Sequence, residues 1–132
     1  MKAKIDTGAR TSALHAADIV EFERDGASWV RFRVQPWQDS DEDAVVVEFP
    51  VHDRRLVRSS SGHASTRYVV LMDIALAGRI ILAEVTLSSR SAMDFRMLIG
   101  REVLQQGFLV DTARSFCGGR PPREVRRRNR GR

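Results

Sequence analysis

The chain has 132 residues, of which 42% are hydrophobic, and a formal net charge of +5 at pH 7. This length predicts one domain with its own hydrophobic core and is too short for two. No stretch approaches the roughly 18 apolar residues of a membrane-spanning helix, the N-terminus has no apolar leader, and the single cysteine, Cys117, excludes an internal disulfide. We therefore expect a cytoplasmic protein with no membrane contact.

The first predicted element is a short strand over Lys2 to Ile5, where apolar and polar residues alternate. It leads directly into Asp6-Thr7-Gly8, and Gly8 allows the backbone to turn sharply or to approach another chain. Such a triplet on its own is more often an ordinary turn than a catalytic loop. Its place at the end of a strand nevertheless makes Asp6 the first candidate for chemistry.

The middle of the chain predicts a series of short strands. Asp25-Gly26 and Ala77-Gly78 are turn signals between alternating segments. The predicted strands cover residues 19–24, 29–34, 45–51, 68–74 and 81–87. Near the C-terminus we expect a short helix over Arg101 to Gln106, which ends at Gly107, and a last strand over Phe108 to Val110. Together these elements predict an all-β fold, a closed or partly open β-barrel or a sandwich, with one short C-terminal helix.

Two irregular stretches interrupt the predicted strands. Residues 35–43 carry several acidic side chains but lack the glycine and the ligand spacing of a calcium loop, so we interpret them as a solvated acidic loop. Residues 54–67 contain a run of serines followed by Gly62 and predict a polar loop or a mobile hairpin.

The positive charge is concentrated at the C-terminus. Seven arginines and one glutamate lie between Cys117 and Arg132, which leaves the rest of the chain close to neutral. A segment so rich in Arg, Gly and Pro cannot bury enough apolar surface to fold alone, so we predict a domain over residues 1–116 and a disordered tail over 117–132. Such a tail is most often a solvated extension. Contact with RNA, the ribosome or an acidic partner is the alternative, although no aromatic residue lies among the arginines to stack on bases.

Several segments, taken together in their order, resemble a known protein family. They are Ala3 to His15 with its Asp-Thr-Gly, Val57 to Gly62, Thr86 to Arg90, Met93, and Met97 to Glu102. This set is similar to a family of bacterial retropepsin-like aspartic proteases that carries the label ATP-dependent zinc protease. The similarity spans residues 2–115, and it implies the retropepsin-like β-barrel, with residues 54–67 at the place of the flap that closes over substrate.

The resemblance also implies an aspartic endopeptidase that hydrolyses a peptide bond. Asp6 would activate water, Thr7 would orient the loop, and Gly8 would let two such loops approach each other. Because the chemistry needs two carboxylates and the chain has one Asp-Thr-Gly, the second is expected from an identical subunit in a homodimer. The remaining expected site residues are, for substrate, Ala9, Arg10, Ser60, Ser61, Gly62 and Arg90, and, for support of the loop, Ile99, Gly100 and Arg101.

The chain departs from viral retropepsins in two places. Arg10 follows Ala9 where the viral enzymes commonly have an acid, so subunit contacts there are expected to differ. The chain also begins only five residues before Asp6. A longer N-terminal strand usually precedes this loop, and if it is missing from this chain, folding or dimerisation is expected to be impaired.

No cofactor and no metal are predicted, despite the words ATP and zinc in the family label. The only lysines are Lys2 and Lys4, so the chain has no P-loop, and its histidines and Cys117 lack the spacing of known zinc sites. No Gly-x-Ser-x-Gly elbow indicates a serine nucleophile.

The expected partner, besides a second subunit, is a peptide or protein substrate. Because the family is often associated with glutamate-ligating enzymes, an acidic, glutamate-rich substrate is conceivable, and Arg10, Arg58 and Arg90 could bind it; surface salt bridges are the commoner use of such arginines. The alternative function is a catalytically silent domain of the same fold that binds a partner, with the Arg-rich tail contacting RNA, the ribosome or an acidic protein.

Overall fold

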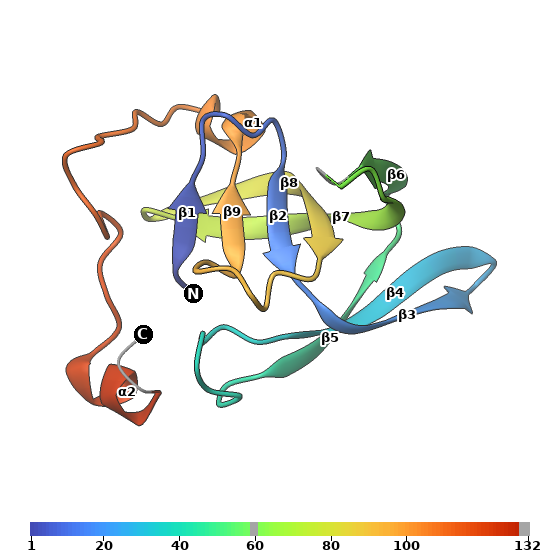
Figure 1. Ribbon diagram of the computed structural model, residues 1–132, viewed down its shortest axis with the longest axis horizontal. Coiled ribbons are helices and arrows are strands. Elements are labelled where there is room, and N and C mark those ends of the chain that lie inside the picture. The colour runs from blue at the N-terminus through green and yellow to red at the C-terminus, as the bar shows by residue number, and fades with distance from the viewer. Residues whose placement is uncertain (59–60, 130–132) are drawn as a thin grey trace.

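The computed structural model describes residues 1–58 and 61–129. Its strands and helices, in chain order, are β1 (Ala3–Ile5), β2 (Ser12–His15), β3 (Ala17–Arg24), β4 (Ala27–Val34), β5 (Val45–Pro50), β6 (Asp53–Arg58), β7 (Ala64–Leu76), β8 (Arg79–Ser88), β9 (Met97–Ile99), α1 (Arg101–Leu104) and α2 (Arg123–Arg128). The predicted all-β fold is confirmed. The strands form two separate sheets, neither of which closes on itself (Figure 1).

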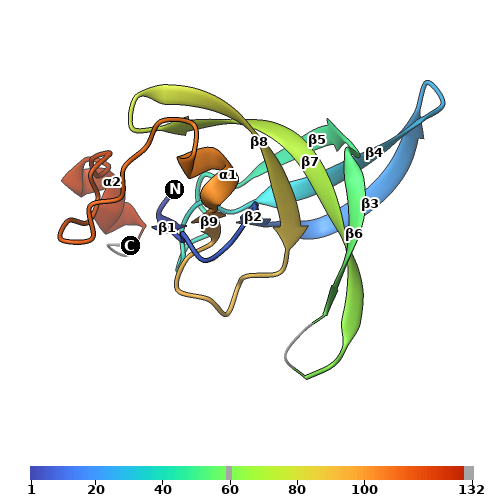
Figure 2. The ribbon, with the colours of Figure 1, turned by 90° about the horizontal axis from the view of Figure 1, so that it is seen from above.

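The larger sheet has six strands in the order β1-β9-β2-β8-β7-β6, and the smaller one has three in the order β3-β4-β5. The outer end of the β3–β4 hairpin lies at one end of the molecule, and α2 lies at the other (Figures 1 and 2). Within the described residues, no helix is both long and apolar enough to cross a membrane.

The core forms where the alternating strands turn their apolar faces toward each other. On β4, Val30 and Phe32 are almost completely buried, while the intervening Arg31 is exposed. Phe32 stacks on Phe49 of β5 with 6.0 Å between the ring centroids. The period of two in the sequence therefore gives the correct inward face of this strand.

Both predicted turns are confirmed, and their backbone angles explain the choice of residues. Asp25 and Gly26 have φ of 52° and 78°, and Ala77 and Gly78 have φ of 48° and 80°. Two successive residues in the left-handed region form the type of two-residue turn that matches the twist of a hairpin. Glycine at the second position of each turn adopts this conformation without a steric penalty.

Of the two alternatives for residues 54–67, a polar loop or a hairpin, the structure shows the hairpin, because β6 and β7 pair antiparallel across most of them. Two predictions near the C-terminus need correction. Helix α1 is shorter than predicted and ends at Leu104. The predicted strand over residues 108–110 is wrong: this segment pairs with no strand of the described chain, and Leu109 is fully exposed. An apolar run alone does not form a strand without a neighbour to accept its hydrogen bonds.

The C-terminal segment contains the short helix α2, which no apolar periodicity in the sequence predicts. The helix is held to the acidic loop that connects β4 and β5. The Ser40 hydroxyl donates to Asn129 Oδ1 at 2.8 Å, and the Asn129 side chain is fully buried. Arg128 lies 3.9 Å from Glu42 and 3.8 Å from Asp43. Opposite charges far apart in the sequence thus bring the basic segment back onto the fold.

Candidate functional site

Asp6 follows the last residue of β1, at the edge of the larger sheet. Strand β1 pairs in parallel with β9, in the register Ala3 to Met97 and Ile5 to Ile99. The ladder continues one step further, because the Asp6 backbone N–H donates to the Ile99 carbonyl at 2.9 Å. The backbone of Asp6 is therefore fixed by the sheet, while its side chain is 28% exposed at the end of the strand.

The two strands that flank β9 are joined by the loop that carries Asp6. Strand β9 lies between β1 and β2, parallel to the first and antiparallel to the second. The connection from β1 to β2 passes over the end of β9 beside α1 (Figure 1). Residues 6–11 consequently contact strands and a helix that come from opposite ends of the sequence, while Thr7, Gly8 and Arg10 stay exposed.

The Asp6 loop is held by hydrogen bonds within itself. The Gly8 N–H donates to Asp6 Oδ1 at 2.9 Å, and the Ala9 N–H donates to the Asp6 carbonyl at 3.3 Å. A side chain at position 8 would place its Cβ 3.1 Å from the same Oδ1. Gly8 therefore leaves room for the carboxylate and donates to it at the same time, which fixes the rotamer of Asp6.

Gly100 and Arg101, at the start of α1, contact this loop and hold it in place. The Arg101 N–H donates to the Ala9 carbonyl at 2.8 Å, and Arg101 Nη1 donates to the Thr7 carbonyl at 3.0 Å. A Cβ at Gly100 would lie 2.5 Å from the Thr11 carbonyl oxygen, closer than real Cβ atoms come to such a neighbour. The close approach of the two segments therefore requires glycine at position 100. The structure thus brings the predicted supporting residues into contact with the predicted catalytic loop.

Basic side chains lie on and near the Asp6 loop. Lys4 Nζ lies 3.9 Å from Asp6 Oδ2, and Arg10 Nε donates to Glu102 at 3.0 Å beside the loop. Burial and the positive charge of Arg67 lower the pKa of the Arg90 guanidinium. The negative charge of the Asp6 carboxylate has the opposite effect and raises this pKa. An anionic ligand beside Asp6 would relieve the repulsion between these two arginines.

Buried His15 positions the loop that carries Arg90. The Arg90 backbone N–H donates to His15 Nδ1 at 2.9 Å, so the proton of the neutral ring is on Nε2, which contacts Gln35 Oε1 at 3.2 Å. Burial lowers the pKa of His15 below its ordinary value, and the hydrogen bond with Gln35 only partly opposes this. Arg90 Nε in turn donates to the Phe95 carbonyl at 3.2 Å. His15 is thus a structural residue of the site.

Other expected substrate residues lie on the hairpin of β6 and β7. Ser61 and Gly62 are at its turn, Ser60 lies outside the described residues, and nothing is described of the Arg58 side chain. No hydrogen bond in the described chain joins Gly62 to the Asp6 loop. The role of this hairpin as a flap stays a prediction.

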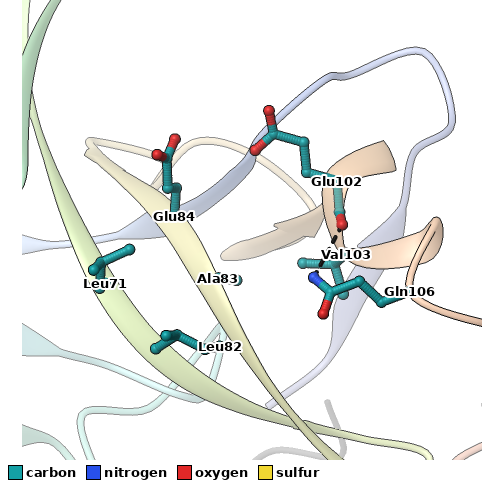
Figure 3. A pocket seen from close by; sticks show the side chains of 7 residues that line it. All are labelled: Leu71, Leu82, Ala83, Glu84, Glu102, Val103 and Gln106. Carbon is teal, nitrogen blue, oxygen red and sulfur yellow. Dashed lines mark hydrogen bonds between the residues drawn. The ribbon is translucent and has the colours of Figure 1, made fainter.

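A separate hollow of about 200 Å³ lies between β7, β8 and α1, with Glu84 and Glu102 at its rim (Figure 3). The pKa of Glu84 is lowered, chiefly by the hydrogen bond from Arg55. Glu102 accepts from Arg10. Each carboxylate therefore has its own arginine, so the two do not share a proton as a catalytic pair does. Within the described ranges, no group of three or more His, Cys, Asp or Glu side chains is arranged to hold a metal ion.

Two residues of the site are missed in the sequence. The buried Ser12 hydroxyl accepts from the Gly100 N–H at 3.1 Å, and Arg67 of β7 acts on the charge of Arg90. Ser12 could have been found as a polar residue at an inward position of the strand after the loop. Arg67 carries no signal, because only the folded sheet brings it near residue 90.

Comparisons with known proteins agree with this geometry. Residues 1–121 match the RimB-like family, described as retropepsin-like aspartic endopeptidase RimB. The chain is 44% identical over 119 residues to a probable alpha-L-glutamate ligase of Shewanella pealeana, a match that covers 90% of this chain and 26% of the relative. A protein with the same name from Desulfotalea psychrophila is 40% identical over 124 residues, covering 94% of this chain and 27% of the relative. The chain thus spans about a quarter of the length of these relatives.

A solved structure supports the same fold. The crystal structure of Lpg0085 from Legionella pneumophila, a protein of unknown function (DUF785), superposes with a TM-score of 0.71. Its sequence is 28% identical, and the match covers 88% of this chain and 83% of that chain.

Proposed function

Because the chain belongs to the RimB-like family of retropepsin-like aspartic endopeptidases, we propose that it is an aspartic peptidase whose active form is a homodimer. The observation that carries this proposal is the Asp6 loop. Its carboxylate accepts from the Gly8 N–H, and its backbone is fixed by β9 and Gly100. A carboxylate held this firmly at the edge of a sheet is suited to orient a water molecule.

The chemistry requires a second carboxylate beside the first. In the proposed dimer, the Asp6 side chains of two subunits share one proton, because repulsion between like charges keeps both from ionising together. The ionised carboxylate takes a proton from water as the water oxygen bonds to the carbonyl carbon, and the protonated one donates to the carbonyl oxygen. When the C–N bond then breaks, the first carboxyl passes its proton to the leaving amine and the second takes its proton back. Since each subunit provides one Asp-Thr-Gly, neither subunit alone completes this pair.

Exposed apolar residues near the site support the dimer. Ile5, immediately before Asp6, is 39% exposed. After α1, Leu109 and Val110 are 100% and 42% exposed and pair with no strand of the described chain. Exposed apolar residues such as these are typical of a surface that a second subunit covers.

The charges beside Asp6 support an acidic substrate. Arg10 is paired with Glu102, but Arg67 and Arg90 repel each other, and Arg101 donates to a backbone carbonyl of the Asp6 loop, which leaves a surplus of positive charge. A glutamate-rich peptide would neutralise this surplus. The names of the relatives point to the same chemistry, because a protein named as a glutamate ligase contains a segment similar to this chain. We therefore include glutamate-rich peptides as the substrate class of the proposal.

The test compares Asp6→Asn with a control at the exposed Asp73 of β7, Asp73→Asn. Cleavage of a fluorogenic glutamate-rich peptide, and of the same peptide with glutamine in place of glutamate, is measured for the wild type and both variants. Asp6→Asn is expected to abolish cleavage with unchanged circular dichroism, and Asp73→Asn to leave the rate unchanged. Cleavage that persists in Asp6→Asn contradicts the peptidase.

Mixing the subunits tests the dimer separately. When wild type and Asp6→Asn are mixed in equal amounts and allowed to exchange, only about one quarter of the dimers carry two aspartates. Activity is then expected at about one quarter of that of the same total concentration of wild type. A value near one half means that each subunit works alone, and the homodimeric site is then wrong.

A further inference from the structure

The C-terminal segment and the β4–β5 connection enclose a second, larger hollow, on a different part of the chain from the Asp6 loop. Its volume is about 520 Å³. Its lining includes Trp37 from the connection, Phe116 and Arg120 from the segment after α1, Arg126 from α2, and Lys2. In Figure 1 the tail and α2 lie beside this end of the molecule, next to the N-terminus.

Two aromatic rings line this hollow. The Trp37 Nε1–H donates to Asp43 Oδ2 at 2.8 Å, which fixes the edge of the indole. Phe116 is 44% exposed, and its φ of 55° lies in the left-handed region, which is unfavourable for a bulky residue. The Phe116 carbonyl accepts from the Gly119 N–H at 2.9 Å, so a turn fixes the backbone that keeps this ring in contact with solvent.

Two arginines at the hollow have no carboxylate partner among residues 1–58 and 61–129. In the part of the chain that the structure describes, neither Arg120 nor Arg126 forms an ion pair with a carboxylate. The Arg120 guanidinium lies 3.8 Å from the centroid of the Phe116 ring, and Arg126 Nε donates to the Pro121 carbonyl at 3.2 Å. The one carboxylate that lines the hollow, Asp43, accepts from Trp37 and lies 3.8 Å from Arg128.

We propose that this hollow binds single-stranded nucleic acid. A base stacks on Trp37 or Phe116, and the phosphates on either side contact Arg120 and Arg126. Positive charge alone would suit any polyanion, but aromatic rings between the arginines add the stacking surface that proteins use for unpaired bases. The sequence shows no aromatic residue among the tail arginines; folding supplies Trp37 from a distant loop. This proposal does not depend on the peptidase site.

The test uses the full chain and a fluorescein-labelled oligouridylate, with affinity measured by fluorescence anisotropy. Trp37→Ala is expected to weaken binding roughly 5- to 100-fold, since one stacked base is lost. Trp37→Phe, which retains a ring without the bond to Asp43, is expected to stay within about 3-fold of the wild type. The matched control is Trp29→Ala, which removes the other tryptophan and its contact with Arg24, 4.5 Å from the ring centroid; no change is expected.

A salt series tests the phosphate contacts. Replacing both Arg120 and Arg126 by alanine is expected to reduce the slope of log affinity against log salt by about 1.4, because each contact to a single strand contributes about 0.7. Trp37→Ala should leave this slope unchanged. Asp6→Asn should bind as the wild type does, which separates this surface from the peptidase.

Four results would overturn the proposal. One is the absence of saturable binding, and another is an equal loss in Trp37→Ala and Trp29→Ala. A loss in Trp37→Phe as large as in Trp37→Ala would show that the indole is only structural. Competition by a glutamate peptide of equal charge, as strong as by the oligonucleotide, would assign the surface to an acidic protein instead.

Discussion

The contact between Gly100 and the Asp6 loop allows a sharp test of how the site is built. Gly100 precedes α1 with φ of −93° and ψ of 179°, an extended conformation that alanine also adopts. Without a steric conflict, Gly100→Ala would therefore raise the free energy of unfolding by about 0.4–1 kcal/mol, because alanine restricts the unfolded chain. The structure predicts the opposite sign, since the new Cβ would lie 2.5 Å from the Thr11 oxygen and 2.6 Å from the Thr11 carbonyl carbon.

The expected loss follows from the bonds that the shift would disturb. Those atoms belong to the backbone, so the loop must move as a unit. The movement strains hydrogen bonds from the Gly100 N–H to Ser12, from the Arg101 N–H to Ala9 and from the Glu102 N–H to Arg10. At about 1 kcal/mol for each of the three bonds, together with about 1–3 kcal/mol for overpacking, we expect a loss of about 4–6 kcal/mol.

Urea unfolding followed by circular dichroism measures this loss, and the peptide assay shows whether the displaced Asp6 still functions. The matched control is Gly118→Ala, because Gly118 lies outside the left-handed region and its Cβ would be 4.0 Å from the nearest atom. The control is expected to be neutral or slightly stabilising. If Gly100→Ala is as stable as Gly118→Ala, the close approach of the two segments does not hold the loop, and the reasoning is refuted.

Two further predictions concern the same site. Gly8→Ala is expected to lower the cleavage rate in the peptide assay far more than the free energy of unfolding in urea, because its Cβ would lie 3.1 Å from Asp6 Oδ1 and displace only the carboxylate. A loss of stability as large as the loss of cleavage would contradict this. The pKa of His15 is lower in the folded protein than in the unfolded chain. Below about pH 6.5 the unfolded chain therefore binds a proton that the folded protein does not, and the free energy of unfolding decreases as the pH decreases. His15→Gln should flatten this fall between about pH 7.5 and 5.5 in urea titrations, while the exposed control His63→Gln retains it; an unchanged slope in His15→Gln would show that another group titrates.

The sequence predicts those parts of the fold that depend on neighbours along the chain. The alternation around Val30 and Phe32 gives the buried face of β4, and the two turns with glycine give the hairpins. The segment over residues 108–110 has the same apolar character but no partner strand, so local composition misleads there. Helix α2 is missed because the signal for it is not local: it depends on contacts with a loop far away in the sequence.

The candidate site is predictable only in pieces. Asp6-Thr7-Gly8 and Gly100 stand out as motifs through the family resemblance, and the structure joins them by direct hydrogen bonds. The charge surplus is harder to predict, since Arg67 and Arg90 belong to different strands and loops. Trp37 gives no indication in the sequence that it faces the C-terminal arginines. Contacts between distant segments therefore account for most of what was missed.

The position of β9 between β1 and β2 also bears on the order in which the protein folds. Ala3 pairs with Met97, so the strand before Asp6 has no neighbour until almost the whole domain has been synthesised. Pairings across such long loops are entropically costly and form late, whereas hairpins such as β3–β4 form early. The nascent chain consequently carries its Asp-Thr-Gly triplet for most of its synthesis without an ordered loop. The Asp6 loop acquires its geometry only after the rest of the domain has folded.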